Sequence, residues 1–421
     1  MAIVLFEDHH CDDLAPITLG RLAAMITCGS LRLVDIVERL GVPTYGISRP
    51  YLEWTQRHDV RSLKILGDDA QDLAEQPSLL LNARLVPSIE NFYALRELLS
   101  SGAREPTVVW DRQQIAAIVA PPVRLQQLQG EGGMQAVAEL LKQAAHWTRD
   151  PRTLSTFQAP HEVVSQNMAI LRSNLEERIR WTSDWTEQRD GVFVGPKVDI
   201  GEYVLFETQS GPIVIEEGAK IGPYTLLRGP LYIGRKCKIL EHAAIKDQVS
   251  LGHTTKIGGE VEASVVEPYS NKQHHGFLGH SYLGSWINLG AGTCNSDLKN
   301  TYGTVNMDYS HGKVATGMQF LGCIMGDYSK TAINTGIFTG KVIGVCSMMY
   351  GFVTSNVPSF VNYARLFGQL ATLPPEVMIA TQSRMFSRRQ VEQRDGDQRL
   401  IHDMYRITQA ERDRFGDALA L

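Results

Sequence analysis

Aliphatic residues recur at every sixth position through one stretch in the middle of the chain. The residues at this spacing are Ile215, Ile221, Leu227, Ile233, Ile239, Ile245, Leu251 and Ile257. A period of six fits neither an α-helix of 3.6 residues per turn nor a strand that alternates at every residue. It does fit a short strand followed by a corner, repeated, with one aliphatic side chain pointing inward on each side. The pattern therefore predicts a β-helix of hexapeptide repeats.

The same period continues on both sides of this stretch, but less regularly. It begins weakly at Val194 and Ile200, and it resumes in a shifted phase at Phe277, Leu283, Leu289, Met325, Ile337, Ile343 and Met349, with Thr331 as a poor fit. Two interruptions remain, at 260–276 and 291–318. Insertions in a solenoid form loops on one face, often the binding face, so these interruptions are expected to carry the chemistry. Glycine supports the repeat region, because 24 of the 37 glycines lie within 191–345.

The rest of the chain has different patterns. Apolar runs at 3–6, 79–81 and 108–110 predict buried strands, and amphipathic patterns at 31–40 and 134–147 predict helices, which together indicate an α/β sheet. An apolar stripe predicts a helix leading into the solenoid; its residues are Val164, Met168, Leu171, Leu175 and Ile179. The domains predicted are an α/β domain over 1–160, a linker helix over 161–190, the β-helix over 191–355, and a C-terminal helical tail over 356–421. The charges of that tail are expected to be a solvated face.

Composition excludes several classes of protein. The chain has 421 residues, of which 43% are hydrophobic and 21% charged, and a net charge of −5. Without a basic surplus, nucleic acid is not an expected partner. No stretch reaches 18 consecutive apolar residues, which argues against a membrane span. The N-terminus lacks a basic region and the six cysteines are scattered, so we expect a cytoplasmic protein with reduced thiols.

A few polar residues in and near the interruptions are candidates for chemistry. His274 could serve as a general base at neutral pH, or it could be a loop histidine without a role. Asn288 and Asn295 could hydrogen-bond sugar hydroxyls or could simply occupy corners. Lys246 could hold a phosphate or be a surface lysine. The acidic and histidine residues at 8–13 are contiguous, a spacing that suits convergent metal ligands poorly, so the metal is left unknown.

Several segments resemble the bifunctional enzymes that make UDP-N-acetylglucosamine, and more closely a divergent GlmU-like branch of sugar nucleotidyltransferases. The matching segments are 241–246, 258–261, 269–272, 276–279, 295–300, 302–303 and 325–330. The resemblance implies a left-handed parallel β-helix that acetylates glucosamine 1-phosphate with acetyl-CoA, joined to an N-terminal uridylyltransferase-like domain. It also implies a homotrimer, since acetyl-CoA binds between subunits in this family.

The resemblance assigns roles to residues of the β-helix. It places the catalytic base at His274 and the aromatic residue of the sugar site, usually a tyrosine, at Phe277. The remaining assignments are Asn288 and Asn295 for the sugar, Lys246 and Lys299 for its phosphate, and Ala291 and Thr316 for acetyl-CoA. At Lys246 the family has an arginine, so the charge is kept but the bidentate geometry is lost.

The N-terminal domain departs from the family pattern. Typical members have a glycine-rich loop after the first strand, whose amides cradle the triphosphate of the nucleotide. Here an acidic segment, 7–13, follows that strand, and the first glycine is Gly20. The Thr18-x-x-Arg21 pair matches the divergent branch, and Arg84 stands near the position of the metal-binding aspartate. We expect Arg21 and Arg84 to contact nucleotide such as UTP, with Mg²⁺ as the metal if transfer occurs, and nucleotidyl transfer to be weak or absent.

Two alternatives remain open. One is a zinc-dependent hydro-lyase, because some left-handed β-helices resemble carbonic anhydrases that bind Zn²⁺ with three histidines; the candidates are His242, His275 and His280. The other is a scaffold whose N-terminal domain binds a nucleotide sugar without catalysis. The sequence leaves the identity of the sugar and of the nucleotide open.

Overall fold

The computed structural model describes residues 1–66, 77–101, 105–121, 128, 133–364 and 368–414. The chain divides into two compact units, which we call the N-terminal unit and the β-helical unit. The N-terminal unit comprises 1–14, 21–26 and 31–158. The β-helical unit comprises 159–421 together with two short segments from near the start of the chain, 15–20 and 27–30.

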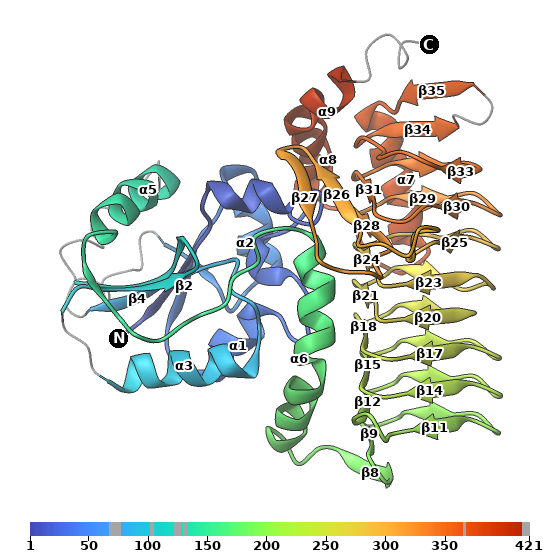
Figure 1. Cartoon of the computed structure of the whole chain (residues 1–421), viewed down its shortest axis with the longest axis horizontal. Coiled ribbons are helices and arrows are strands. Elements are labelled where there is room, and N and C mark those ends of the chain that lie inside the picture. The colour runs from blue at the N-terminus through green and yellow to red at the C-terminus, as the bar shows by residue number, and fades with distance from the viewer. Residues whose placement is uncertain (67–76, 102–104, 122–127, 129–132, 365–367, 415–421) are drawn as a thin grey trace. The chain divides into compact units, whose positions relative to one another are not determined.

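The N-terminal unit is an α/β domain with one mixed sheet (Figure 1). Its strand order is β3-β2-β1-β4-β6-β5-β7. The strands are β1 Ile3–Phe6, β2 Thr44–Ile47, β3 Lys64–Ile65, β4 Ser78–Asn82, β5 Thr107–Asp111, β6 Gln114–Ala120 and β7 Thr148–Arg149. Strands β2, β1 and β4 are parallel, whereas β6 runs antiparallel to both β4 and β5. The three apolar runs predicted as strands are therefore confirmed as β1, β4 and β5.

Helices accompany this sheet. They are α1 Leu33–Arg39, α2 Glu53–Asp59, α3 Ile89–Ser100 and α5 Gly133–Ala144. Helix α3 is capped by Ser88, whose hydroxyl accepts a hydrogen bond from the Asn91 amide at 3.1 Å and so satisfies one free N–H of the first turn. Helices α1 and α5 confirm the two amphipathic patterns, although both helices are shorter than the patterns that predicted them.

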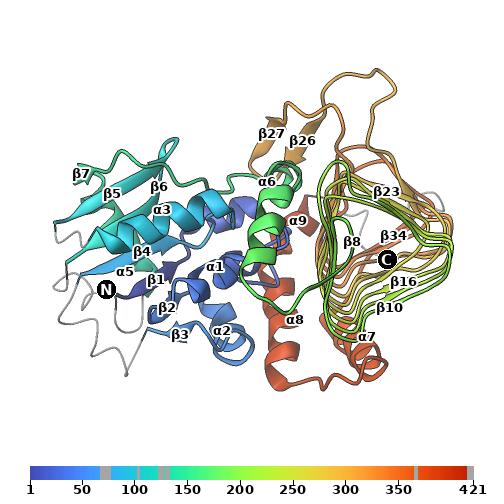
Figure 2. The ribbon, with the colours of Figure 1, turned by 90° about the horizontal axis from the view of Figure 1, so that it is seen from below.

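The β-helical unit winds as a left-handed parallel β-helix with three faces, and Figure 2 shows its coils stacked around a common axis. The first face contains β8 Thr186–Arg189, β9 Val192–Val194, β12 Ile213–Ile215, β15 Leu231–Ile233, β18 Val249–Leu251, β21 Val265–Val266, β24 Tyr282–Leu283, β28 Cys323–Met325 and β31 Lys341–Ile343. The second face contains β10 Asp199–Ile200, β13 Lys220–Ile221, β16 Lys238–Ile239, β19 Lys256–Ile257 and β22 Asn271–Lys272, followed by β29 Lys330–Thr331, β32 Met348–Met349, β34 Val361–Ala364 and β35 Gln369–Thr372. The third face contains β11 Leu205–Glu207, β14 Leu226–Arg228, β17 Ala244–Lys246, β20 Glu260–Glu262 and β23 Phe277–Gly279, followed by β25 Cys294–Asn295, β30 Gly336–Ile337 and β33 Phe352–Val353.

The hexapeptide ladder forms the core of this unit. All eight aliphatic residues of the unbroken period are at most 3% exposed and belong to one hydrophobic cluster. The glycine after an inward residue allows adjacent coils to approach closely. A Cβ at Gly222, for example, would lie 2.5 Å from the backbone nitrogen of Glu241. The predicted β-helix is therefore confirmed down to its inward residues.

The two predicted interruptions have different outcomes. Residues 260–276 are not a loop: they contain β20, β21 and β22, in a coil with fewer residues than its predecessors. This shortening also corrects the resumed phase, since Leu278 is the inward residue of β23 and Phe277 is only half-buried. The second interruption is an insertion that carries an antiparallel hairpin, β26 Asn306–Tyr309 and β27 Gly312–Ala315. Of the two interruptions, only the part of the second one that follows β25 leaves the β-helix.

Helices pack on the outside of the coils. The predicted stripe forms α6 His161–Arg180, which runs along the first face (Figure 1). Its Leu171 and Leu175 cluster with Val214 and Tyr232 of that face. The C-terminal tail contains α7 Pro375–Ser387, α8 Asp395–Ile407 and α9 Gln409–Asp413, and residues 415–421 lie outside the described part. In α7, Phe386 packs on the ring of Trp286 with their centroids 4.4 Å apart. The tail predicted over 356–421 is therefore helical only from Pro375 on, because β34 and β35 extend the β-helix beyond its predicted end at 355. The helical part has an apolar contact with the β-helix.

Segment 27–30 is joined to the rest of the β-helical unit by buried hydrogen bonds. Glu267 is 1% exposed, and its carboxylate accepts the Thr27 amide at 2.9 Å and the Thr27 hydroxyl at 2.8 Å. The Tyr282 hydroxyl donates to the same carboxylate at 2.9 Å. The Gly29 amide donates to the side chain of Asn167 on α6 at 2.8 Å. Because buried polar groups are costly without partners, these bonds fix segment 27–30 in the β-helical unit.

Candidate functional site

His274 lies in the turn between β22 and β23, at the edge of the third face. Its side chain is exposed, and within the described ranges its imidazole has no hydrogen-bond partner. The backbone of the turn is more constrained than this side chain. Gly276 adopts a φ of 129°, and a Cβ there would lie 2.1 Å from the carbonyl oxygen of Thr293 on the next coil. The turn thus presents an accessible imidazole on a fixed backbone, which suits a general base.

Strand β23 continues from this turn along the third face. Phe277 is paired in register with Glu260 of β20, and the two residues occupy equivalent outward positions. Asn295 of β25 faces the other way. It is 5% exposed, and its side chain accepts from the Gly279 amide at 2.8 Å and donates to the Gly279 carbonyl at 3.0 Å. Asn295 therefore supports β23 from inside, and it has this structural role whether or not it contacts a sugar.

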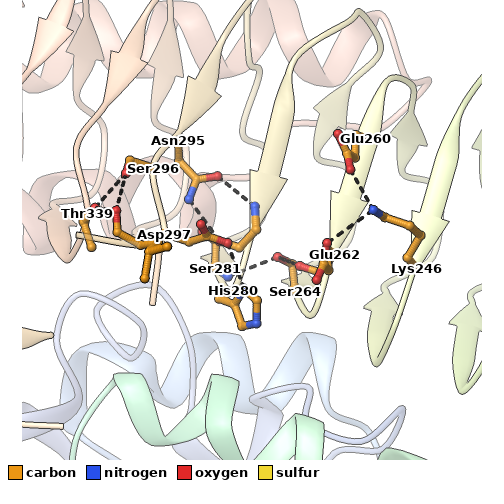
Figure 3. Close-up of polar contacts among 12 residues, drawn as sticks. Lys246, Glu260, Glu262, Ser264, His280, Ser281, Asn295, Ser296, Asp297 and Thr339 are labelled. Atoms are coloured by element: carbon orange, nitrogen blue, oxygen red, sulfur yellow. Dashed lines mark hydrogen bonds and ion pairs between the residues drawn. The ribbon is translucent and has the colours of Figure 1, made fainter. Parts of the chain in front are cut away.

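Lys246 is held by two carboxylates (Figure 3). Its Nζ lies 2.7 Å from Oε1 of Glu260 and 3.4 Å from Oε2 of Glu262. The hydrogen bond to Glu260, with the charges of both glutamates, raises the pKa of Lys246 above its ordinary value. A phosphate approaching this ammonium would also meet two negative charges, so any anion bound here competes with the glutamates.

The other residues predicted for the β-helix lie in different places. Asn288 is exposed on the second face, where it bridges Asn271 and Lys330. Ala291 is half-buried in the corner that follows, and this corner contacts the His274 turn, because the Gly292 amide donates to the His275 carbonyl at 3.1 Å. The structure therefore brings together His274, Phe277 and the Ala291 corner.

Lys299 and Thr316 both lie in the insertion between β25 and β28. The Lys299 Nζ donates to the Thr304 carbonyl at 3.0 Å. The Thr316 hydroxyl donates to the Val305 carbonyl at 2.6 Å and accepts from the Met318 amide at 3.1 Å. Each of these side chains is bonded within the insertion, and no contact joins either one to the His274 turn in the described part of the chain.

One polar pair was missed by the sequence reasoning. His280 follows β23 and is 8% exposed, and its Nδ1 lies 2.9 Å from a carboxylate oxygen of Asp297 on the next coil (Figure 3). A histidine bonded to a carboxylate is the arrangement that orients many catalytic imidazoles. The pair lies beyond the opposite end of β23 from His274.

The histidines of the zinc alternative are not gathered within the chain. His242 stacks on Tyr224, His275 lies in the turn before β23, and His280 is bonded to Asp297 after it. Among the described residues there is no group of three His, Cys, Asp or Glu side chains that could hold a metal ion.

Arginines in the N-terminal unit are engaged by carboxylates that follow β1. Arg84 is fully buried; its Nε and Nη2 donate to the two oxygens of Asp8 at 3.1 and 3.0 Å, and its Nη1 donates to the Phe157 carbonyl at 2.7 Å. Burial would raise the pKa of Asp8, but the hydrogen bond and charge of Arg84 outweigh it and lower that pKa below its usual value. Arg49 binds Glu7 in the same way, and Arg49 also donates to the carbonyl of the buried Arg21 at 3.1 Å.

These ion pairs occupy the carboxyl ends of β1 and β4, the edge where open α/β sheets bind ligands. Glu7 and Asp8 are already bound by arginines, which does not fit a magnesium site built on these two carboxylates.

In the ranges that the structure describes, no helix is both long and apolar enough to cross a bilayer.

Comparison with known proteins gives partial matches. Residues 3–180 match the family model described as sugar nucleotidyl transferase. A protein of Rippkaea orientalis named bifunctional protein GlmU is 25% identical over 203 residues, which cover 42% of this chain and 40% of that protein. A protein of Sulfurisphaera tokodaii, named bifunctional sugar-1-phosphate nucleotidylyltransferase/acetyltransferase, is 31% identical over 142 residues, covering 33% and 35%. The GlmU protein of Methanococcus aeolicus is 30% identical over 150 residues, covering 35% and 36%. The match thus spans between 35% and 40% of the length of these relatives.

Proposed function

Because residues 3–180 carry a sugar nucleotidyl transferase domain and the chain is a divergent relative of the bifunctional GlmU proteins, we propose that it acetylates the amino group of a sugar phosphate with acetyl-CoA. The observation that carries the proposal is the joining of this domain to a β-helix in one chain. The Sulfurisphaera tokodaii relative is named for both nucleotidyl transfer and acetyl transfer in one chain. Glucosamine 1-phosphate is the acceptor we favour.

The chemistry is a direct transfer at the His274 turn. The His274 imidazole accepts a proton from the attacking amine, whose nitrogen forms a C–N bond with the thioester carbonyl of acetyl-CoA. The C–S bond then breaks, and the proton held by His274 passes to the departing thiolate of coenzyme A. No covalent enzyme intermediate is needed, and no cysteine has a role.

The neighbouring residues bind the two substrates. Phe277 packs against the sugar, and Asn288 and Asn295 are assigned to it, Asn295 acting through the backbone of Gly279. Lys246 and Lys299 are the cations for the phosphate, and Ala291 and Thr316 are assigned to acetyl-CoA. Because the latter two lie in separate parts of one chain, an acetyl-CoA site completed by a second subunit of a homotrimer fits them best. Light scattering at micromolar concentration tests this, and a stable monomer near 47 kDa counts against it.

The N-terminal unit is proposed to bind the nucleotide part of a sugar nucleotide or UTP, with Arg21 as the candidate for its phosphates, because Arg84 is held by Asp8 and the Phe157 carbonyl. The ion pairs of Glu7 and Asp8 favour a second candidate for this unit, binding without turnover, because they replace the glycine-rich loop that would cradle a triphosphate. Fast nucleotidyl transfer by the pure protein would exclude that candidate.

The testing experiment incubates the pure protein with acetyl-CoA, UTP and a panel of amino sugars and their phosphates, and identifies products by mass spectrometry. Formation of an N-acetylated sugar phosphate supports the proposal. Failure to acetylate any amine in the panel contradicts it, and carbon dioxide hydration with one bound zinc per chain would favour the hydro-lyase instead.

A further inference from the structure

A lysine takes the place of an isoleucine in the core of the β-helix. On the second face, inward residues pair coil by coil, Ile221 with Ile239, Ile239 with Ile257, and Ile257 with Lys272. From β10 to β34 the inward residues along this face are nine: Ile200, Ile221, Ile239, Ile257, Lys272, Leu289, Thr331, Met349 and Tyr363. Lys272 is the only one of these nine that carries a charge.

This position is unfavourable for an ammonium. Lys272 is 2% exposed, and in the described part of the chain no carboxylate forms an ion pair with it. Burial lowers the pKa of Lys272 to about 8. Removing a charge from water without an ionic partner costs free energy, whereas a methionine or isoleucine here would fill the same space at no such cost. The lysine therefore weakens the core, and a structural role alone does not account for it.

The amine is directed at the turn that carries His274. Its Nζ donates to the carbonyl of Gly258 at 2.8 Å and to the carbonyl of His274 itself at 3.2 Å. The space around it is tight: Gly259 has a φ of 69°, and a Cβ there would lie 2.9 Å from the Lys272 Nζ and equally close to the His274 carbonyl oxygen. From the interior of the β-helix, the ammonium thus joins the His274 turn to the preceding coil.

We propose that Lys272 is a positioning residue for His274. By binding the His274 carbonyl, it fixes the backbone from which the imidazole projects, so that the base stays aligned with the acceptor amine. This rests on the function proposed for the His274 turn. Burying the ammonium lowers the stability of the fold, and in return the position of the His274 backbone is fixed. Residues that are unfavourable for packing are expected at functional sites.

The test replaces Lys272 by methionine, which keeps the length and removes the amine, with Ile257→Met on the adjacent coil as the matched control. For Lys272→Met we expect an equal or higher melting temperature, a kcat for acetyl transfer at least tenfold lower, and a KM for acetyl-CoA within threefold of wild type. Hydrogen exchange followed by mass spectrometry should show faster exchange of the amides over 273–277. Ile257→Met should leave kcat, KM and the exchange rates over 273–277 within twofold of wild type.

Lys272→Ile, which restores the ladder residue, gives a second variant should methionine pack poorly. If the wild type acetylates its acceptor and both variants keep a kcat within twofold of it, the positioning role is overturned. If the wild type acetylates nothing, the proposed function fails, and exchange over 273–277 then decides alone. If amide exchange over 273–277 is unchanged in both variants, Lys272 does not position the turn. Faster exchange supports the positioning role.

Discussion

The Nδ1 of His280 lies 2.9 Å from the Oδ2 of Asp297, one coil further along the β-helix. Both side chains are largely buried, at 10% and 14% exposed. Since His274 lies before β23 and His280 after it, the strand separates two different imidazoles. One is exposed and has no partner among the described residues, and the other is buried and held by a carboxylate. The two histidines are thus expected to respond differently to substitution.

His280→Ala leaves the Asp297 carboxylate buried without its partner. We expect the free energy of unfolding to fall by about 1–3 kcal/mol, the range for an unsatisfied buried polar group. The kcat per folded molecule should stay within threefold of wild type. Urea unfolding and steady-state kinetics check both quantities. A hundredfold loss of kcat at unchanged stability would instead make His280 the base.

His274→Ala should have the opposite effects. A general base contributes roughly 10²–10⁴ in rate, so kcat for acetyl transfer should fall at least a hundredfold. The melting temperature should not change, because the exposed imidazole has no hydrogen bond to lose in the described structure. His275→Ala is the control and should remain within tenfold of wild type. If the two variants exchange behaviours, the base is His275.

Glu262→Gln should improve the binding of a phosphorylated acceptor. The substitution removes one of the two negative charges that hold Lys246, so the ammonium becomes more available to a phosphate. We expect the KM for the sugar phosphate to fall about 3–10-fold, in line with the modest energies of partly exposed ion pairs, with kcat unchanged. Glu217→Gln, in the exposed pair with Lys197, is the matched control. An unchanged or higher KM in Glu262→Gln would show that Lys246 does not receive the phosphate.

The stability of Lys272→Met relative to wild type should depend on pH. The pKa of Lys272 is about 8 in the folded chain and 10.5 ordinarily. Between these values the unfolded state binds more protons, so this group makes the wild type more stable as pH rises from 8 to 10.5. The advantage of the variant should therefore be largest below pH 8 and shrink by up to about 3 kcal/mol by pH 10.5. Urea unfolding of both proteins at several pH values measures the difference, and a pH-independent difference would mean that the amine is not buried as a charge.

Arg84→Ala tests the N-terminal unit. Removing the guanidinium leaves Asp8, whose side chain is 9% exposed, without its cation, a change that costs about 3–5 kcal/mol for a buried pair. We expect nucleotidyl transfer, where it occurs, to be lost together with the stability of this unit, and acetyl transfer to persist. Thermal unfolding followed alongside both activities checks this. A fully stable Arg84→Ala protein without nucleotidyl transfer would indicate that Arg84 contacts the nucleotide directly.

The regular part of the β-helix was predictable because one period sets both the coil length and the inward direction. From Ile239 to Ile257 the coil has the 18 residues of three hexapeptides, and both residues are buried as the ladder requires. From Ile257 to Lys272 it has only 15. Once the coil length changes, periodicity no longer indicates which side chains point inward. For this reason Lys272 was not recognised as a core residue and Phe277 was placed inward.

The site contacts were harder to predict for a related reason. His280 and Asp297 are 17 residues apart, and their contact depends on how many residues the intervening coil contains. Arg84 reaches Asp8 across 76 residues, through the pairing of β1 with β4. The local sequence gives no sign of this buried ion pair, because Arg84 is there only a single arginine after an apolar run.

The bond between Thr27 and Glu267 has a consequence for how the protein is made. These residues are 240 positions apart, so a ribosome that has just added Thr27 must add 240 more residues before Glu267 is part of the chain. At roughly 5–20 residues per second, this takes about 12–48 s. Throughout that time Thr27 lacks the carboxylate that accepts its two hydrogen bonds. Residue 27 therefore obtains its final hydrogen bonds only after more than half of the chain has been made, whereas β1 can pair with β2 as soon as residue 47 exists.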